Sequence, residues 1–401
     1  MQFIGIDVAE GSSVCVSVKG GHQVGSISFK HNRGGFNQLK HFISQTADKP
    51  VLVFESTGTY SDSLARFCRA ENYIFYELNA FEAKIKMRQS RPNKTDAHDA
   101  FHLALLAETQ YTSLHTRRVL GEPFFSLRQL SRQYHQFFES RRRTINNLHA
   151  VLETTFRELN DVLDSFTRPV NLAIIRLYPH PDLLFGLSKS QIISQVSNQV
   201  SRQTRPSGIR KRCVDVLRAA ELSYPAVSSS SVMIEIIRRY CDQIESLNSE
   251  IKLLVKELIK TAGQSNQFSI LCSIPGVGQL SAALLMGELG DINQFKTYKQ
   301  LNAYAGIDTR HYQSGKTEKA DIITRHGRPR ARLVMYQIIV GMLLNQQRTP
   351  SHITDYYYKM KRQPFNKKHM VAVTACMNQL TRTICNLVHT NQKYEYRKAS
   401  H

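Results

Sequence analysis

Two long stretches of apolar residues at three- and four-residue spacing place the strongest constraint on what this chain can fold into. The first covers residues 124–166 and is interrupted only at Arg141, inside the run Arg141-Arg142-Arg143; the second covers residues 237–258 without a break. This rhythm predicts two long amphipathic helices, and its length favours a coiled coil over two ordinary core helices. We therefore expect a homodimer or higher oligomer joined through the coiled coil.

Basic residues are in excess and are unevenly distributed. The 401 residues include 53 Lys and Arg against 32 Asp and Glu, which gives a formal net charge of +21. Residues 1–110 hold 12 basic and 11 acidic residues, so almost all of the excess lies in the remainder. This predicts a polyanionic partner, either nucleic acid or an anionic membrane surface. A membrane is disfavoured, because the apolar run 338–344 is far shorter than the ~20 residues of a spanning helix.

The N-terminus and the cysteines indicate a cellular compartment. No basic segment precedes an apolar core at the N-terminus, so we expect no secretory signal. The seven cysteines are scattered and form no Cys-x-x-Cys pair. This pattern is typical of reduced thiols rather than of a disulfide framework or a zinc site. The sequence therefore predicts a cytoplasmic protein.

The first 115 residues alternate short strands and helices. The expected strands cover residues 3–8, 14–18, 24–29, 51–54 and 73–78, and the expected helices cover residues 36–43, 60–68 and 95–108. Gly20-Gly21 between the second and third strands predicts a hairpin. A hairpin followed by alternating helices and strands predicts an α/β sheet domain over residues 1–115.

The rest of the chain divides by composition into three further parts. Residues 120–262 form the predicted coiled-coil region, and residues 265–390 form a mainly helical domain that is followed by a basic tail, 391–401. Within the coiled-coil region, residues 167–231 are polar and irregular. They carry the basic residues Arg202, Arg205, Arg210, Lys211 and Arg212. We interpret this segment as an inserted, partly flexible basic subdomain. We expect its basic cluster, together with Arg141, Arg142 and Arg143, to bind nucleic acid.

Four acidic residues in the first domain are candidate metal ligands. Asp7 ends the first strand and Glu55 ends a later buried strand, while Asp96 and Asp99 lie three apart on one helix and therefore face one side. Carboxylates gathered in this way are what a two-metal phosphodiester site needs, because hard oxygen ligands hold Mg²⁺. Taken one at a time, each acid is more often a cap or a surface residue.

Three segments of the first domain together resemble a known family. Residues 5–8 (Gly-Ile-Asp-Val), 54–58 (Phe-Glu-Ser-Thr-Gly) and 93–100 (Asn-Lys-Thr-Asp-Ala-His-Asp-Ala) are similar to the signatures of the DEDD transposases of the IS110 family. The resemblance implies a RuvC-like domain of RNase H fold in which Asp7, Glu55, Asp96 and Asp99 hold Mg²⁺, with Mn²⁺ as an alternative ion. It also implies double-stranded donor and target DNA as substrates, in a bacterial or archaeal cell, with the protein associated with the nucleoid.

A second group of motifs lies in the C-terminal helical domain. The turn 273–278, which contains Gly276 and Gly278, opens an apolar helix and exposes backbone N–H groups that suit a phosphate, although a structural turn fits equally well. Residues 301–307, 310–316 and 323–332 then follow in an order that resembles the second domain of the same family. The resemblance assigns the nucleophile to Ser314. The basic residues expected to bind nucleic acid here are Arg310, Lys316, Arg325 and Arg328.

These features predict a DNA transposase or recombinase that acts through a phosphoserine intermediate. The resemblance further implies guidance by a structured, bridge-type non-coding RNA. Because residues 313–316 offer no base, we expect the carboxylate domain to activate Ser314, within one chain or across subunits. Three alternatives remain open: a RuvC-like junction nuclease that activates water, a non-catalytic nucleic-acid-bridging protein, and a sugar kinase or actin-like ATPase. The last is disfavoured because no second Asp-x-Gly phosphate loop is found.

Overall fold

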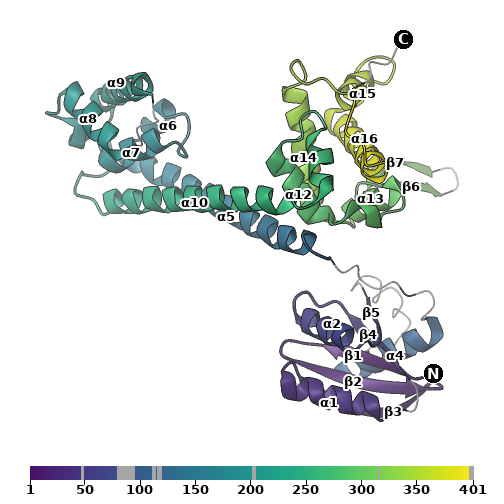
Figure 1. The fold of residues 1–401 in the computed structure, drawn as a ribbon. Helices are drawn as coiled ribbons and strands as arrows, with labels where there is room; N and C mark the ends of the chain where they lie inside the picture. Colours follow the sequence, from purple (N-terminus) through teal and green to yellow (C-terminus); the bar gives the residue numbers. More distant parts are fainter. Residues whose placement is uncertain are drawn as a thin grey trace. The chain divides into compact units, whose positions relative to one another are not determined.

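The computed structural model describes residues 1–46, 49–78, 95–110, 114, 120–200, 205–314 and 317–396, and of residues 309–314 and 317–322 it describes the backbone only. The chain divides into two compact units, residues 1–119 and 120–401. In Figure 1 the first unit contains the elements labelled β1 to β5, α1, α2 and α4, and the second contains the remaining labelled elements. None of the helices in these described segments combines the length and apolarity that crossing a bilayer requires.

The first unit is built on a five-stranded mixed sheet with the strand order β3-β2-β1-β4-β5. The strands are β1 (Phe3–Val8), β2 (Ser12–Lys19), β3 (His22–Lys30), β4 (Val51–Glu55) and β5 (Ile74–Leu78). Strand β1 runs antiparallel to β2 and parallel to β4. Gly20 and Gly21 both have positive φ, which a tight turn between β2 and β3 requires. The predicted hairpin is therefore confirmed.

Helices cover both faces of this sheet. Helix α4 (Asp96–Gln110) packs on one face, in a core that includes Phe3, Val51 and Val53. Helices α1 (Arg33–Ser44) and α2 (Tyr60–Ala70) pack on the other face, over a core that includes Ile4, Ile6, Leu52 and Phe54. Strands β1 and β4 are therefore apolar almost throughout, as expected of strands buried on both sides. This α/β arrangement is consistent with the predicted RNase H-like domain.

The two predicted long helices form an antiparallel pair within one chain. They are α5 (Phe124–Thr155) and α10 (Met233–Ala262), and they lie side by side in Figure 1. The start of α5 shares a core with the end of α10, where Leu127 packs near Leu258, and the end of α5 shares a core with the start of α10. The two ends of the apolar seam are thus buried inside the chain, whereas Phe138 near its middle is exposed. The expectation of a coiled coil that joins subunits through this seam is not supported.

The segment expected to be irregular is helical. After α6 (Leu159–Val162) come α7 (Pro169–Leu177), the 3₁₀ turn η2 (Pro181–Leu184), α8 (Lys189–Gln199) and α9 (Pro206–Leu222). These elements share a buried core with the neighbouring ends of α5 and α10. The helices are short and begin at prolines or at the Ser188 capping box, so no long apolar rhythm marks them in the sequence. The prediction of an irregular segment was wrong for this reason.

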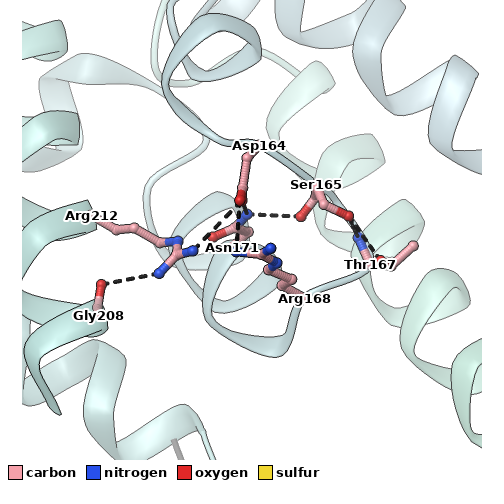
Figure 2. Close-up of polar contacts among 7 residues, drawn as sticks. All are labelled: Asp164, Ser165, Thr167, Arg168, Asn171, Gly208 and Arg212. Atoms are coloured by element: carbon pink, nitrogen blue, oxygen red, sulfur yellow. Dashed lines mark hydrogen bonds and ion pairs between the residues drawn. The ribbon is translucent and has the colours of Figure 1, made fainter. Parts of the chain in front are cut away.

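A polar cluster around Asp164 holds this helical tip together (Figure 2). The Asp164 carboxylate forms an ion pair of 2.6 Å with Arg168 and a longer one of 3.7 Å with Arg212 of α9. The Asn171 side-chain amide donates to Asp164 Oδ1 at 3.1 Å and to the Ser165 carbonyl at 2.8 Å. The cluster therefore ties the loop before α7 to α9. It also directs Arg212, which the sequence placed in a basic nucleic-acid-binding cluster, toward a carboxylate.

The C-terminal part of the second unit surrounds one apolar core. Its helical elements are α11 (Asn266–Cys272), α12 (Gln279–Leu289), η3 (Ile292–Gln294), α13 (Tyr298–Ala305), α14 (Pro329–Leu344), α15 (His352–Lys361) and α16 (His369–His389). Between α13 and α14, β6 (Thr309–Ser314) and β7 (Thr317–Ile323) form an antiparallel hairpin. Helix α12 is buried along almost its whole length and forms the centre of this core.

Candidate functional site

Asp7 and Glu55 lie at neighbouring strand ends on the same face of the sheet. The parallel pairing of β1 with β4 matches Ile6 with Phe54, so Asp7 and Glu55 are the next residues along the two strands. Side chains alternate between the faces of a sheet, and Phe3 and Val53 face α4. The side chains of Asp7 and Glu55 therefore also point to the α4 face.

Helix α4 approaches this face unusually closely at Gly5. A β-carbon built on Gly5 would overlap the carbonyl oxygen of Ala100 and would lie 2.5 Å from the amide nitrogen of Ala104. Only glycine permits two backbones to come this near. Because Asp99 precedes Ala100 on α4, this approach carries its carboxylate toward the ends of β1 and β4.

The three carboxylates interact electrostatically. The pKa of the Glu55 carboxyl is raised, first by its partial burial and then by the negative charges of Asp7 and Asp99. Like charges at short range favour protonation of one group unless a cation compensates them. The structure thus brings together three of the four predicted acids, although 92 positions separate Asp7 from Asp99.

Asp96 occupies a different place from the other three acids. It is the exposed first residue of α4, about one turn before the half-buried Asp99, and it is not among the charges that act on Glu55. Carboxylate oxygens that repel one another form a donor set that suits a hard divalent cation. Within the described residues, however, no three Asp, Glu, His or Cys side chains lie close enough to enclose a metal. Metal ligation by these acids stays a prediction.

Two histidines beside this cluster were not identified from the sequence. His98 and His102 lie one turn apart on α4, and their Nε2 atoms are 3.1 Å apart. The pKa of His102 is lowered, mainly by burial and then by His98, while Asp99 acts in the opposite direction. The sequence did show that the two histidines are four residues apart on a predicted helix. That spacing is too common on helices to identify them as functional residues.

Ser314 is placed at the end of a β-hairpin. It is the last residue of β6, and its backbone pairs with Thr317, the first residue of β7. Gly315 and Lys316 lie outside the described residues, as do the side chains of Arg310 and Ser314. The structure therefore locates the predicted nucleophile at a strand end, and its side-chain environment stays a prediction.

The base of this hairpin is held firmly against α13. The amide of Thr324 donates to the Asp308 carbonyl at 2.9 Å, and the amide of Arg328 donates to the Tyr304 carbonyl at 3.0 Å. Gly306 and Gly327 touch backbone to backbone, with no room for a β-carbon on either. Arg328 lies over the Tyr304 ring, 5.1 Å from its centroid. The predicted cation Arg328 is thus positioned by the same contacts that anchor the hairpin, while Arg325 is exposed beside it.

A buried arginine that the sequence did not single out connects this region to α5. Arg128 Nε donates to the Gly287 carbonyl at 3.0 Å, and its Nη2 donates to the Glu288 carbonyl at 3.0 Å and to the Tyr304 hydroxyl at 3.1 Å. Burial is the main cause that lowers the pKa of this guanidinium. Arg128 therefore ties the end of α12 to the tyrosine on which Arg328 rests. In the sequence Arg128 only follows Leu127 within the apolar pattern of residues 124–166, so nothing there predicted that it would bond to α12 and Tyr304.

The structure separates the three arginines of the 141–143 run. Arg141 Nη1 donates to Asn248 Oδ1 of α10 at 2.8 Å, and its guanidinium lies 5.1 Å from the centroid of the Phe138 ring. Arg142 and Arg143 are exposed, and Arg142 forms an ion pair of 2.7 Å with Glu139. Arg141 thus holds the helix pair together, whereas the other two point to solvent.

Gly276 and Gly278 also differ in their surroundings. Gly276 has a φ of +83° and lies against α14, where a β-carbon would come 2.5 Å from Met342 Cγ. Gly278 has open space around it and immediately precedes α12. Packing accounts for Gly276, and only Gly278 leaves room for a phosphate at the start of a helix.

Comparison with protein families matches both motif-bearing parts of the chain. A family model of DEDD transposases of the IS110 type, described as "Transposase", matches residues 4–157. A second model, described as "Transposase IS116/IS110/IS902 family", matches residues 268–357. Together they include the carboxylates of the first unit, α5 and the hairpin that carries Ser314.

Curated relatives match over shorter regions. A pilin gene-inverting protein of Moraxella bovis is 26% identical over 162 residues, which cover 40% of this chain and 48% of that protein. The transposase for insertion sequence element IS1111A of Coxiella burnetii is 36% identical over 73 residues, or 18% of this chain and 20% of that protein. A probable family 20 transposase of Pseudomonas aeruginosa is 25% identical over 93 residues, or 23% and 28% of the two chains. The matches span about half the length of these relatives or less.

Proposed function

Because this chain belongs to the IS110 family of transposases, we propose that it is a DNA transposase that cuts and rejoins DNA strands. The observation that carries the proposal is the convergence of Asp7 and Asp99 on Glu55, at the face of the sheet that α4 covers. A structural role alone does not require two carboxylates to lie where their charges raise the pKa of a third. Such an arrangement is expected at a catalytic site that acts on a phosphodiester.

Asp7, Glu55 and Asp99, together with Asp96 from the first turn of α4, would hold divalent metal, and Mg²⁺ is the ion proposed. When bound, such ions stabilise charge on the attacking and leaving oxygens of a phosphodiester. The chain's own contribution is to hold the carboxylates at one place through the close approach of α4 to Gly5.

Ser314 is proposed as the nucleophile. Its Oγ would form a bond to phosphorus, the bond from phosphorus to the leaving oxygen would break, and the leaving strand would keep its hydroxyl with the proton that serine loses. Attack by a second DNA hydroxyl on the phosphoserine would then join strands and restore the serine. The position of Ser314 in a hairpin whose base is anchored beside the cations Arg325 and Arg328 supports this assignment.

Double-stranded donor and target DNA are the proposed substrates, and a structured bridge-type RNA is the proposed guide. The excess of basic residues in the second unit supports a polyanionic partner in general. The family supports the DNA part, and RNA guidance rests on the resemblance described above.

The test uses the full chain and a suicide substrate made from the DNA that flanks its gene. The wild-type protein should become covalently attached to this DNA, and Ser314→Ala should lose both the adduct and strand joining. Asp99→Asn should abolish strand exchange and leave DNA binding nearly unchanged, with Glu250→Gln on the exposed face of α10 as a matched control. Cleavage that persists in Ser314→Ala, with no adduct in the wild type, would instead identify a nuclease that activates water.

A further inference from the structure

A long polar groove on the C-terminal part of the second unit is distinct from the hairpin that bears Ser314. Two hollows of about 520 and 660 Å³ adjoin each other and share Tyr298, Gln379 and Arg382. We call them together the α13–α16 groove. Helix α16 forms its floor, the first turn of α13 forms one wall, and residues of α15 and of the segment after α16 form the other.

The floor of the groove is a polar stripe along α16. Asn378, Gln379, Arg382, Thr383 and Asn386 follow one another at alternating spacings of one and three residues, so they share one face of the helix. From Asn378 to Asn386 the stripe extends about 12 Å at the rise of an α-helix. The opposite face of α16, which includes Leu380 and Ile384, is buried in the core. Side-chain amides therefore line a surface that leads along the helix rather than into a closed pocket.

A cation and an aromatic ring meet at the centre of the groove. The Arg382 guanidinium lies 4.8 Å from the centroid of the Tyr298 ring, and its Nη2 donates to the Tyr298 hydroxyl at 3.1 Å. Arg382 is exposed and Tyr298 is half-buried. The guanidinium is therefore held beside the ring while the residue remains accessible to solvent. A planar guanidinium fixed in this way is a platform on which another flat group can stack.

The charges around this platform favour an anion. Lys296 and Lys299 are exposed on the α13 wall, and Thr297 caps the start of that helix, where the backbone dipole is positive. The acids that line the groove are Asp308 and Glu395, at its two ends. The Asp308 carboxylate accepts a hydrogen bond of 2.5 Å from the Thr324 hydroxyl. The central part of the groove thus combines three cations with a stacking plane and amides.

We propose that the α13–α16 groove binds unpaired nucleotides of a single-stranded nucleic acid. Flat bases stack on aromatic rings and on arginine planes, side-chain amides form paired hydrogen bonds with the edges of bases, and lysines contact the phosphates. All three kinds of group occur here on one continuous surface. A duplex does not match it, because the edges and faces of paired bases are not free to enter such a groove.

The position of the groove links it to the hairpin. Asp308 lines one end of the groove, and β6 begins at the next residue, Thr309. A strand held along α16 would therefore be directed toward the base of the hairpin that carries Ser314. The proposal rests on the proposed nucleic-acid function, but it concerns binding and not strand cleavage, so the two can fail separately.

The test measures binding of the full chain to short labelled oligonucleotides by fluorescence anisotropy at fixed ionic strength. Single-stranded RNA, single-stranded DNA of the same sequence and the corresponding DNA duplex are compared. Arg382→Gln and Tyr298→Leu should each weaken single-strand binding about tenfold, the scale of one stacked base. Arg239→Gln, which removes an exposed arginine of α10 outside the groove, is the control for the loss of one positive charge.

The comparison has defined outcomes. A loss that is larger for single strands than for duplex supports the groove, and its preference for RNA or DNA identifies the source of the nucleotides. Equal losses for single strands and duplex, no larger than that of Arg239→Gln, would overturn the proposal. Gln379→Ala removes a groove side chain without disturbing the contact between Arg382 and Tyr298. It replaces the other two groove variants in the binding test if thermal unfolding shows that they do not fold.

Discussion

The backbone of Gly5 on β1 lies directly against the carbonyl group of Ala100 on α4, with no space between them for a β-carbon. This single contact sets the distance between the sheet and the helix that carries Asp96 and Asp99. The positions of Asp7 and Asp99 around Glu55 therefore depend on a residue that has no side chain.

Replacing Gly5 by alanine should separate α4 from the sheet. Overpacking of this kind costs about 1–3 kcal/mol of unfolding free energy, and strand exchange should be lost with it. Gly34→Ala is the control, because the β-carbon there would meet only Asn32 Oδ1 at an ordinary 3.5 Å, and alanine within a helix stabilises by up to about 1 kcal/mol. Denaturant unfolding of both variants measures the difference, and equal stabilities would contradict the role given to Gly5.

Arg128 should be essential to the stability of the second unit. Arg128→Met removes three hydrogen bonds from a charged donor and leaves the buried Glu288 without that neighbouring charge. We expect a loss of roughly 2–4 kcal/mol. Arg132→Met, at an exposed position on the same helix, should change stability by less than about 0.5 kcal/mol. Thermal unfolding checks this, and a similar melting temperature for both variants would show that the network contributes little.

The helical tip should lose stability in acid. The pKa of the Asp164 carboxyl is lowered, first by the hydrogen bond from Asn171 and then by the charges of Arg168 and Arg212. A lowered pKa means that the stabilisation is present above the ordinary carboxyl range and is lost as pH falls through the pKa of the folded state. Amide hydrogen exchange of α7 and α9 should therefore be faster in Asp164→Asn than in the wild type at neutral pH.

The difference in amide exchange rate between Asp164→Asn and the wild type should shrink as the pH falls below the lowered pKa of Asp164. Asp161→Asn, at an exposed position on α6, is the matched control and should leave exchange unchanged at both pH values. A difference between Asp164→Asn and the wild type that persists undiminished in acid would rule out the carboxylate as its cause.

Arg142 and Arg143 should contribute to nucleic-acid binding, whereas Arg141 should contribute to folding. If both exposed arginines contact phosphates, replacing them by glutamine should reduce the slope of log affinity against log salt by about 2. Arg141→Gln should instead destabilise the α5–α10 pair, because Arg141 bonds to Asn248. Titrations at several salt concentrations, together with thermal unfolding, separate the two effects. An identical slope for the double variant and the wild type would exclude the phosphate contacts.

Local patterns in the sequence were enough to predict the elements of the first unit. The glycine pair between two alternating segments predicts the β2–β3 hairpin, and the buried runs around Asp7 and Glu55 predict β1 and β4. Because strand and turn preferences act over a few residues, these elements follow from the sequence alone. The motifs likewise identified the three acids that the fold brings together.

The partners of these elements were decided only by the tertiary structure. The apolar rhythm of residues 124–166 and 237–258 shows that two helices each have an apolar face, but not what covers that face. In the structure α5 and α10 cover one another, so Arg141 becomes a link between them, and Arg128 becomes buried beneath Tyr304. The short helices α7 to α9 depend on the core they share with this pair. Periodicity specifies which side of an element avoids water, whereas the surface that replaces the water is chosen by packing between residues far apart in the chain.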